Sequence, residues 1–169
     1  MIIELASVGV LPKALKESFT PDDVELDGEG ELVSVATLDA DVFSKDEKVY
    51  IRGRIGTIIR LECTRCLENV TTPADLDFEA IFVDASKEDS ESEVEVKDAA
   101  LDESLVLDGR IDLREVVREQ LLLSLPEQVY CSDDCKGLCP KCGTNRNLLD
   151  CKCDEGDIDP RWAALKNLR

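Results

Sequence analysis

The cysteines constrain this chain more than any other feature of its sequence. The chain has 169 residues, of which eight are cysteine and none is histidine. The eight are Cys63, Cys66, Cys131, Cys135, Cys139, Cys142, Cys151 and Cys153. In a reducing compartment, closely spaced cysteines are more often metal ligands than disulfides. We therefore predict that all eight are ligands of zinc, which binds four thiolates in a tetrahedron.

The C-terminal cysteines have the spacing of a zinc knuckle. Two residues separate Cys139 from Cys142, so a tight turn can direct both sulfurs at one ion. Gly143 follows directly and can adopt the positive φ that such a turn needs. Cys151 and Cys153 come after a short loop and can complete a four-thiolate site.

The other four cysteines come from two segments that are distant in the sequence. Cys63 and Cys66 lie far from Cys131 and Cys135, so a site built from these four would attach the C-terminal segment to the middle of the chain. Other arrangements stay open. The two CxxC segments can face each other as in a zinc ribbon, a single zinc can leave several thiols free, and four cysteines also suit an iron–sulfur cluster. We therefore predict one or two structural zinc ions.

Alternating apolar residues on both sides of Cys63 and Cys66 predict a long β-hairpin. Those before the cysteines occupy odd positions: Val49, Ile51, Ile55, Ile59 and Leu61. Those after them occupy even positions: Val70, Thr72, Ala74, Leu76, Phe78, Ala80 and Phe82. Because side chains alternate between the two faces of a strand, each set shares one face. The two cysteines then lie at the tip of the hairpin.

A single helix is predicted over residues 112–124. Asp112 is a suitable N-cap, Glu115 follows at the spacing of a capping box, and Pro126 ends the helix. Its apolar face consists of Leu113, Val116, Val117 and Leu121.

Together these segments predict an α+β protein. We expect an antiparallel β-sheet or partly open barrel with one packed helix, followed by a C-terminal cysteine-rich zinc-binding module. The β-rich domain covers residues 1–126, including an acidic loop over 84–103, and the zinc module covers residues 127–169. Further strands are predicted over residues 2–5, 32–43 and 104–107. The module ends in a short helix carrying Trp162, which we expect to pack on it.

The charge of the chain restricts its partners. At pH 7 the formal net charge is −18, which repels phosphate backbones and favours a basic protein partner. The N-terminus lacks the basic region and apolar run of a secretory signal, and no stretch approaches the roughly 20 apolar residues of a membrane helix. We therefore predict a cytoplasmic protein with no membrane partner. No feature indicates a small-molecule substrate.

Several motifs carry a resemblance to a known family. The matching segments are Cys63-Thr64-Arg65-Cys66-Leu67-Glu68, Ile111-Asp112-Leu113, Glu119, Leu125-Pro126, the run from Cys135 to Gly143, Asn145, Asn147, Cys151-Lys152-Cys153 and Asp159-Pro160-Arg161-Trp162. They resemble the YceD family of large ribosomal RNA subunit accumulation proteins. Arg146 departs from this family, which often has an apolar residue there.

The resemblance implies a role in accumulation or processing of large-subunit ribosomal RNA during ribosome assembly, and it implies no enzymatic activity. With the negative charge, it points to a ribosomal protein or processing factor as the partner and to indirect contact with the RNA. Two alternatives stay open. A thiol- or zinc-dependent redox protein needs an exposed thiolate of lowered pKa. A regulator that binds nucleic acid needs a basic recognition helix, whereas helix 112–124 carries only Arg114 and Arg118 among acidic residues.

Overall fold

The structure is a computed structural model that describes residues 1–85, 103–153 and 161. The chain divides into two units. The first, here called the sheet unit, comprises Met1–Leu61 and Asn69–Glu127. The second, here called the cysteine unit, comprises Glu62–Glu68 and Gln128–Arg169. The segment around Cys63 and Cys66 therefore belongs with the C-terminal part of the chain.

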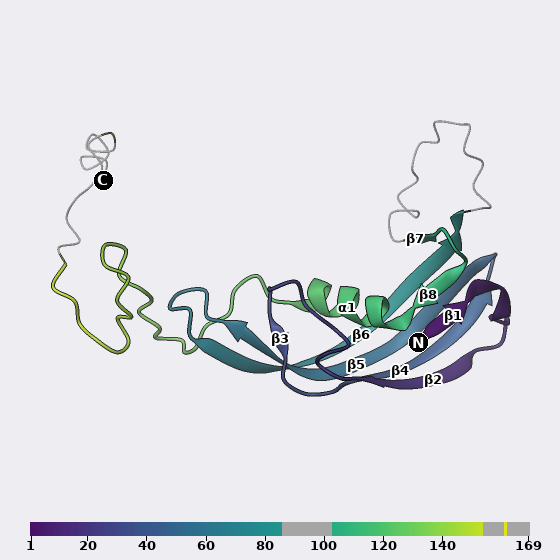
Figure 1. The fold of residues 1–169 in the computed structure, drawn as a ribbon, viewed down its shortest axis with the longest axis horizontal. Coiled ribbons are helices and arrows are strands. Elements are labelled where there is room, and N and C mark those ends of the chain that lie inside the picture. Colours follow the sequence, from purple (N-terminus) through teal and green to yellow (C-terminus); the bar gives the residue numbers. More distant parts are fainter. Residues whose placement is uncertain (86–102, 154–160, 162–169) are drawn as a thin grey trace. The chain divides into compact units, whose positions relative to one another are not determined.

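Over its described residues, the sheet unit contains two open β-sheets and one α-helix (Figure 1). Its elements are β1 (Ile2–Glu4), the 3-10 helix η1 (Leu5–Ser7), β2 (Lys13–Phe19), β3 (Glu31–Leu32), β4 (Ala36–Lys45), β5 (Lys48–Glu62), β6 (Asn69–Asp84), β7 (Glu103–Val106), β8 (Arg110–Asp112) and α1 (Leu113–Ser124). β1 pairs with β8, and the larger sheet has the order β2-β4-β5-β6-β7, with β3 paired to β5. The fold is therefore mostly β-sheet with one helix.

The partly open barrel, one of the two predicted architectures, is wrong. Among the described strands β2 and β7 stand at opposite edges of the larger sheet, so this sheet does not close on itself. The sheet is also not wholly antiparallel, because β7 pairs with β6 in parallel. A parallel pair needs a crossover connection, and the chain between Asp84 and Glu103 is long enough to provide one.

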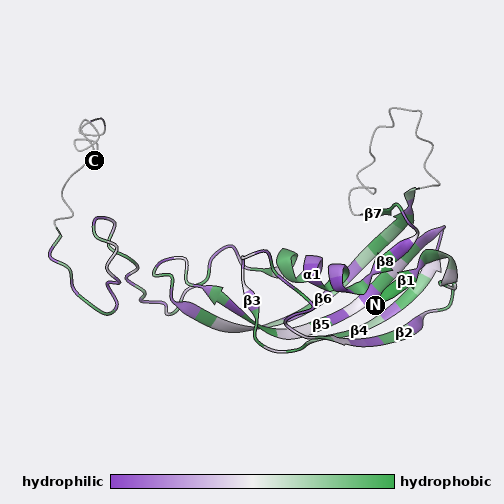
Figure 2. Cartoon of the chain, in the orientation of Figure 1, coloured by the Kyte–Doolittle hydropathy of each residue, from purple (hydrophilic) through white to green (hydrophobic). Residues whose placement is uncertain are grey.

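The predicted hairpin is confirmed and forms the centre of the sheet. Val49, Ile51, Ile55, Ile59 and Leu61 of β5 are all buried. Along β6 the even positions are the less exposed ones, and Phe78 and Phe82 are buried. Figure 2 shows the resulting alternation of hydrophilic and hydrophobic residues along the strands. Helix α1 contacts β6 and β8, and its four predicted core residues are all buried.

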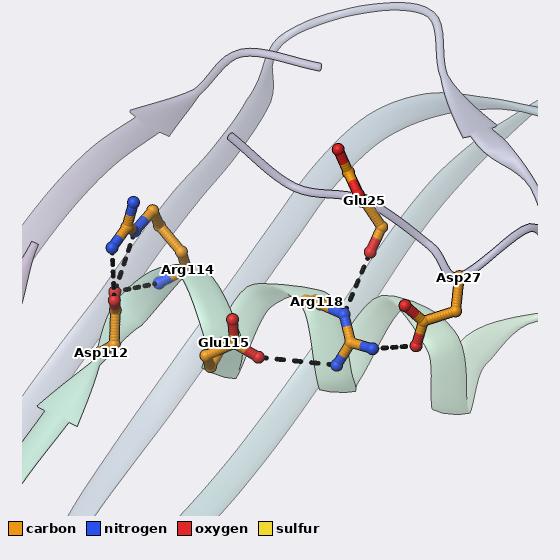
Figure 3. Close-up of polar contacts among 6 residues, drawn as sticks. All are labelled: Glu25, Asp27, Asp112, Arg114, Glu115 and Arg118. Atoms are coloured by element: carbon orange, nitrogen blue, oxygen red, sulfur yellow. Dashed lines mark hydrogen bonds and ion pairs between the residues drawn. The ribbon is translucent and has the colours of Figure 1, made fainter. Parts of the chain in front are cut away.

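Polar contacts join helix α1 to its N-cap and to the segment that precedes β3 (Figure 3). Asp112 is the N-cap, as predicted, and its Oδ1 accepts a hydrogen bond of 3.0 Å from the backbone N–H of Arg114. Glu115 lies 3.5 Å from the guanidinium of Arg118, one turn further along the helix. Arg118 also pairs with Asp27, so the helix is joined to the segment that precedes β3. The Arg118–Asp27 pair thus ties α1 to this segment.

Two strands were not predicted, and one predicted strand is divided. β2 has the pattern of a half-exposed edge strand, in which the polar Lys16 and Ser18 alternate with Leu15, Glu17 and Phe19. β8 has only three residues. The segment 32–43, predicted as one strand, forms β3 and then β4.

Part of the prediction lies outside the described residues. This applies to most of the acidic loop and to the terminal helix with Trp162. Within the residues that the structure describes, no helix has both the length and the apolar character needed to cross a membrane.

Candidate metal centre

The eight cysteines come together in two groups of four, and both groups lie in the cysteine unit. The hairpin group consists of Cys63, Cys66, Cys131 and Cys135, and the terminal group consists of Cys139, Cys142, Cys151 and Cys153. Within each group all four Sγ atoms lie within 4.8 Å of one another. These are the two sets of four that the sequence analysis first combined, one from the two C-terminal pairs and one from the four remaining cysteines. Each group can hold a metal ion.

The distances between sulfur atoms fit a single four-coordinate ion. Sγ of Cys63 lies 3.8 Å from Sγ of Cys135, and Sγ of Cys66 lies 3.5 Å from Sγ of Cys131. A zinc–sulfur bond of about 2.3 Å gives a tetrahedron with edges of about 3.8 Å. A disulfide would require about 2.05 Å, and all eight cysteines are free thiols. In a four-iron cluster each thiolate binds a different iron, which would set the sulfurs further apart.

A tight turn places the first two cysteines of the hairpin group. The N–H of Cys63 donates to the carbonyl of Glu68 (2.8 Å), and the N–H of Leu67 donates back to the carbonyl of Cys63 (2.9 Å). Leu67 adopts a positive φ of 62° to close this turn. Because strand pairing ends here, the side chains of Cys63 and Cys66 can both point to one place.

The C-terminal segment is held against this turn by backbone hydrogen bonds. The N–H and hydroxyl of Thr64 both donate to the carbonyl of Val129, at 2.8 and 3.0 Å. The N–H of Leu138 donates to the carbonyl of Arg65 (2.9 Å). The guanidinium of Arg65 in turn donates to the carbonyl of Cys135 (3.2 Å) and lies over the ring of Tyr130. These contacts bring the two halves of the hairpin group together.

The terminal group is built on the predicted knuckle. The N–H of Gly143 donates to the carbonyl of Cys139 (2.9 Å), and the N–H of Cys139 donates to the carbonyl of Thr144 (2.8 Å). Gly143 has a φ of 71°, the positive value predicted for it. Sγ of Cys142 lies 3.2 Å from the hydroxyl of Thr144.

The two groups differ in exposure. In the hairpin group three cysteines are buried and Cys131 is exposed. In the terminal group only Cys139 is buried, whereas Cys142 is exposed and Cys151 and Cys153 are half-buried. The terminal group is therefore the more accessible of the two.

The thiols of the hairpin group have divergent pKa values. Burial raises the pKa of Cys63, but backbone N–H donors, those of Arg65 and Cys131 foremost, outweigh it and lower the pKa to about 6. For Cys66 the N–H of Glu68 lowers the pKa, but burial and the neighbouring thiols raise it to about 12. Adjacent thiolates repel one another, so one ionises readily only while its neighbour keeps its proton. A divalent cation at their centre would stabilise all four as thiolates.

The terminal group shows the same division. The hydroxyl and N–H of Thr144 lower the pKa of Cys142 to about 6. Hydrogen bonding to Cys142, burial and Cys139 together raise the pKa of Cys153 to about 12. The donor set thus fits a cation that prefers thiolate ligands.

Two asparagines of the family resemblance lie beside the hairpin group, one contacting a cysteine of the group and the other Glu68 of the turn. The side-chain Nδ2 of Asn147 donates to Sγ of Cys135 (3.3 Å) and lowers the pKa of this thiol. Nδ2 of Asn145 donates to Oε1 of Glu68 (3.2 Å). Asn145 also serves a turn, because its Oδ1 accepts from the N–H of Asn147 (2.9 Å). The sequence did offer one signal for Asn147: its amide lies between the cysteine pairs Cys139/Cys142 and Cys151/Cys153. Hydrogen-bond donors next to metal-binding cysteines often support them from the outer shell.

The fold and site define a class of protein: an open β-sheet and helix joined to a unit with two four-cysteine groups. Residues 51–169 match the family of the large ribosomal RNA subunit accumulation protein YceD. This match covers more than half of the chain and all eight cysteines. The chain belongs to the YceD family.

Individual relatives agree with this assignment. The chain is 31% identical over 98% of its length to the uncharacterized protein Rv2926c of Mycobacterium tuberculosis, of which 79% is covered. It is 29% identical to YlbN of Bacillus subtilis, over 73% of this chain and 68% of YlbN. It is 27% identical to the large ribosomal RNA subunit accumulation protein YCED homolog 1, chloroplastic, of Arabidopsis thaliana, over 76% of this chain and 47% of the relative. No solved structure matches the chain significantly.

Proposed function

We propose that this chain is a non-enzymatic factor that supports accumulation and processing of large-subunit ribosomal RNA during ribosome assembly. It does so on a scaffold stabilised by two structural zinc ions. One observation carries the proposal: the family match spans both groups of four convergent cysteines. The family is named for accumulation of the large ribosomal RNA subunit, and its name specifies no catalysed reaction.

The ligand set argues for a structural role of the zinc. Four thiolates fill the tetrahedron, whereas catalytic zinc sites keep one position for water or substrate. The chain has no histidine to serve as a general base near either group. When bound, zinc would join the four sulfurs of each group and offset their charge. The residues around it provide the hydrogen bonds that hold the ligands in place.

Zinc would also supply most of the stability of the cysteine unit. Among its described residues, the buried hydrophobic side chains are all cysteines: Cys63, Cys66, Cys135 and Cys139. A core without aliphatic or aromatic side chains gains little from the hydrophobic effect. Structural zinc contributes about 10–16 kcal/mol of apparent folding free energy in finger-sized peptides, which is as large as the stability of a typical domain.

The charge of the cysteine unit favours a protein partner. Residues 62–68 and 128–153 contain five basic and five acidic side chains, so their formal charges cancel. Each zinc tetrathiolate adds a charge of about −2, which makes the loaded unit acidic. Lys136 and Lys152 therefore serve to offset the thiolates. The proposed partner is a basic ribosomal protein or processing factor, contact with the ribosomal RNA is indirect, and the proposed compartment is the reducing cytoplasm.

Two experiments test this function. In a strain that lacks the gene, we expect the ratio of large- to small-subunit ribosomal RNA to fall, and we expect the wild-type gene to restore it. A C63S/C66S variant should fail to restore it. Affinity purification should recover a basic protein in a complex that resists ribonuclease. An unchanged ratio, or tight and salt-insensitive binding of naked ribosomal RNA fragments, would overturn the proposal.

The redox alternative has one observation in its favour: the exposed Cys131 lies close to Cys66. A redox centre, however, needs one reactive pair of cysteines. Here four sulfur atoms come together in each of two groups. Stoichiometric disulfide turnover by zinc-free protein would support the redox reading. Thiols that become unreactive on addition of zinc and reactive again with a chelator would support the structural one.

A further inference from the structure

The segment between the two ligand pairs of the terminal group also contacts the hairpin group. Asn147 lies between Cys142 and Cys151, yet its Nδ2 donates to Sγ of Cys135 in the other group at 3.3 Å. Its Oδ1 accepts from the backbone N–H of Lys136, the residue after this ligand, at 2.8 Å. One side chain therefore contacts both a thiol ligand and the backbone beside it.

Further hydrogen bonds join this segment to the same region. The N–H of Arg146 donates to the carbonyl of Gly137 (2.9 Å), and Leu138 and Asn145 form an isolated antiparallel bridge. Nδ2 of Asn145 reaches Oε1 of Glu68 in the hairpin turn (3.2 Å). The loop of one group thus forms part of the support of the other.

We propose that the two metal sites are thermodynamically coupled through Asn147, so that metal in the terminal group strengthens metal binding in the hairpin group. This inference rests on the metal sites proposed above. Metal bound by Cys139, Cys142, Cys151 and Cys153 closes both ends of the 143–150 loop and fixes its conformation. Asn147 is then already held where it can donate to Cys135. Metal binding in the hairpin group therefore does not have to fix the position of Asn147 itself. Coupling of this kind is reciprocal between the two sites.

The expected loss of zinc affinity follows from what hydrogen bonds to metal-binding cysteines contribute. Removing one such partner of a metal ligand typically lowers metal affinity by about 10- to 100-fold. An N–H donor to a thiolate also reduces the repulsion among the four sulfurs. We therefore expect N147A to weaken zinc binding in the hairpin group by about 10- to 100-fold and, because the coupling is reciprocal, to weaken zinc binding in the terminal group by a comparable factor.

The test measures zinc occupancy at each cysteine of the full-length protein. Samples are equilibrated over a series of buffered free-zinc concentrations and pulsed with an alkylating reagent, and protection of each thiol is read by mass spectrometry. Protection of Cys63 and Cys66 reports the hairpin group, and protection of Cys151 and Cys153 reports the terminal group. L148A is the matched control, because Leu148 lies in the same loop and its side chain is 73% exposed.

A double-mutant cycle separates coupling from a purely local effect of Asn147. C151S/C153S removes the terminal site and should weaken the hairpin site about as much as N147A does. Adding N147A to C151S/C153S should then weaken the hairpin site by less than about threefold more. By reciprocity, C63S/C66S should weaken the terminal site by a factor similar to that of C151S/C153S on the hairpin site.

The outcomes distinguish this inference from the proposed function. If wild-type protein protects both groups and N147A or C151S/C153S leaves the hairpin site unchanged, the coupling is wrong and the zinc scaffold stands. If N147A and C151S/C153S reduce the affinity independently, coupling through Asn147 is likewise wrong. If zinc protects neither group in wild-type protein, both proposals fall. Circular dichroism of helix α1 checks that each variant retains the folded sheet unit.

Discussion

Sγ of Cys63 lies 3.8 Å from Sγ of Cys135, although 72 positions separate the two residues in the sequence. One residue belongs to the turn between β5 and β6, and the other belongs to the segment that follows α1. The turn supplies only two cysteines, too few for a four-thiolate site of its own. The hairpin group therefore exists only when the chain has brought both segments together.

Loss of one hairpin ligand should release the C-terminal segment without unfolding the sheet. In C135S, we expect faster amide exchange over residues 128–153, because the buried hydrophobic side chains among the described residues of the cysteine unit are all cysteines. The amides of Leu138 and Cys139, which donate to backbone carbonyls, should show the largest loss of protection. Hydrogen exchange with mass spectrometry measures this. S132A is the matched control, and equal protection in C135S and wild type would contradict the expectation.

Gly53 allows β4 and β5 to approach each other closely. It pairs with Ala40 across the two strands, and a Cβ at this position would lie only 2.4 Å from Cβ of Ala40. We expect G53A to destabilise the sheet unit by about 1–3 kcal/mol, the usual cost of overpacking. Urea denaturation followed by circular dichroism measures the free energy of unfolding. At Gly56 an added Cβ would meet only Thr37, at 3.4 Å, so G56A should cost much less. Similar costs for both would refute this account.

Asp112 should stabilise the sheet unit both as a cap and as a charge. The D112A substitution removes the acceptor for the N–H of Arg114, and we expect a loss of about 1 kcal/mol in the free energy of unfolding. D112N keeps a capping oxygen and loses the ion pair with Arg114, so it should cost less. Thermal or urea unfolding near pH 7 compares the two variants.

The charge of Asp112 predicts a pH dependence of stability. Hydrogen bonds from the Arg114 side chain, despite burial, lower the pKa of Asp112 from 3.8 to about 2. A lowered pKa means that the ionised carboxylate stabilises the fold above its ordinary pKa, and that this contribution is lost as the pH falls toward 2. Between pH 5 and pH 2, wild type should therefore lose more stability than D112N. An equal loss of stability in wild type and D112N would show that protonation of Asp112 does not contribute to the pH dependence.

The hairpin and the helix could be predicted because local patterns determine them. The odd positions of β5 and the even positions of β6 are apolar, and burial of one face follows directly from that alternation. Asp112 marked the start of α1 by its capping chemistry. β2 gave no such signal, because an edge strand half exposed to solvent carries Lys16 and Glu17 as readily as a loop does.

The open edges of the sheet and the side chains around the cysteine groups depend on tertiary structure. The alternation of apolar and polar residues within a strand does not indicate whether β2 and β7 pair with each other. The sequence therefore could not distinguish an open sheet from a barrel. Cysteine spacing suggested the observed grouping but left others open, since the two CxxC segments could also have faced each other in one site. The contact of Asn147 with Cys135 could not be predicted, because it joins a loop of one group to a ligand of the other.

The central claim is that two zinc ions occupy two four-thiolate sites. Native mass spectrometry of the full-length protein purified from cells, combined with elemental analysis, tests it most directly. We predict two zinc ions per chain, and we predict eight titratable thiols once a chelator has removed them. A chain without zinc that carries free thiols or disulfides, or a mass that corresponds to an iron–sulfur cluster, would contradict the claim.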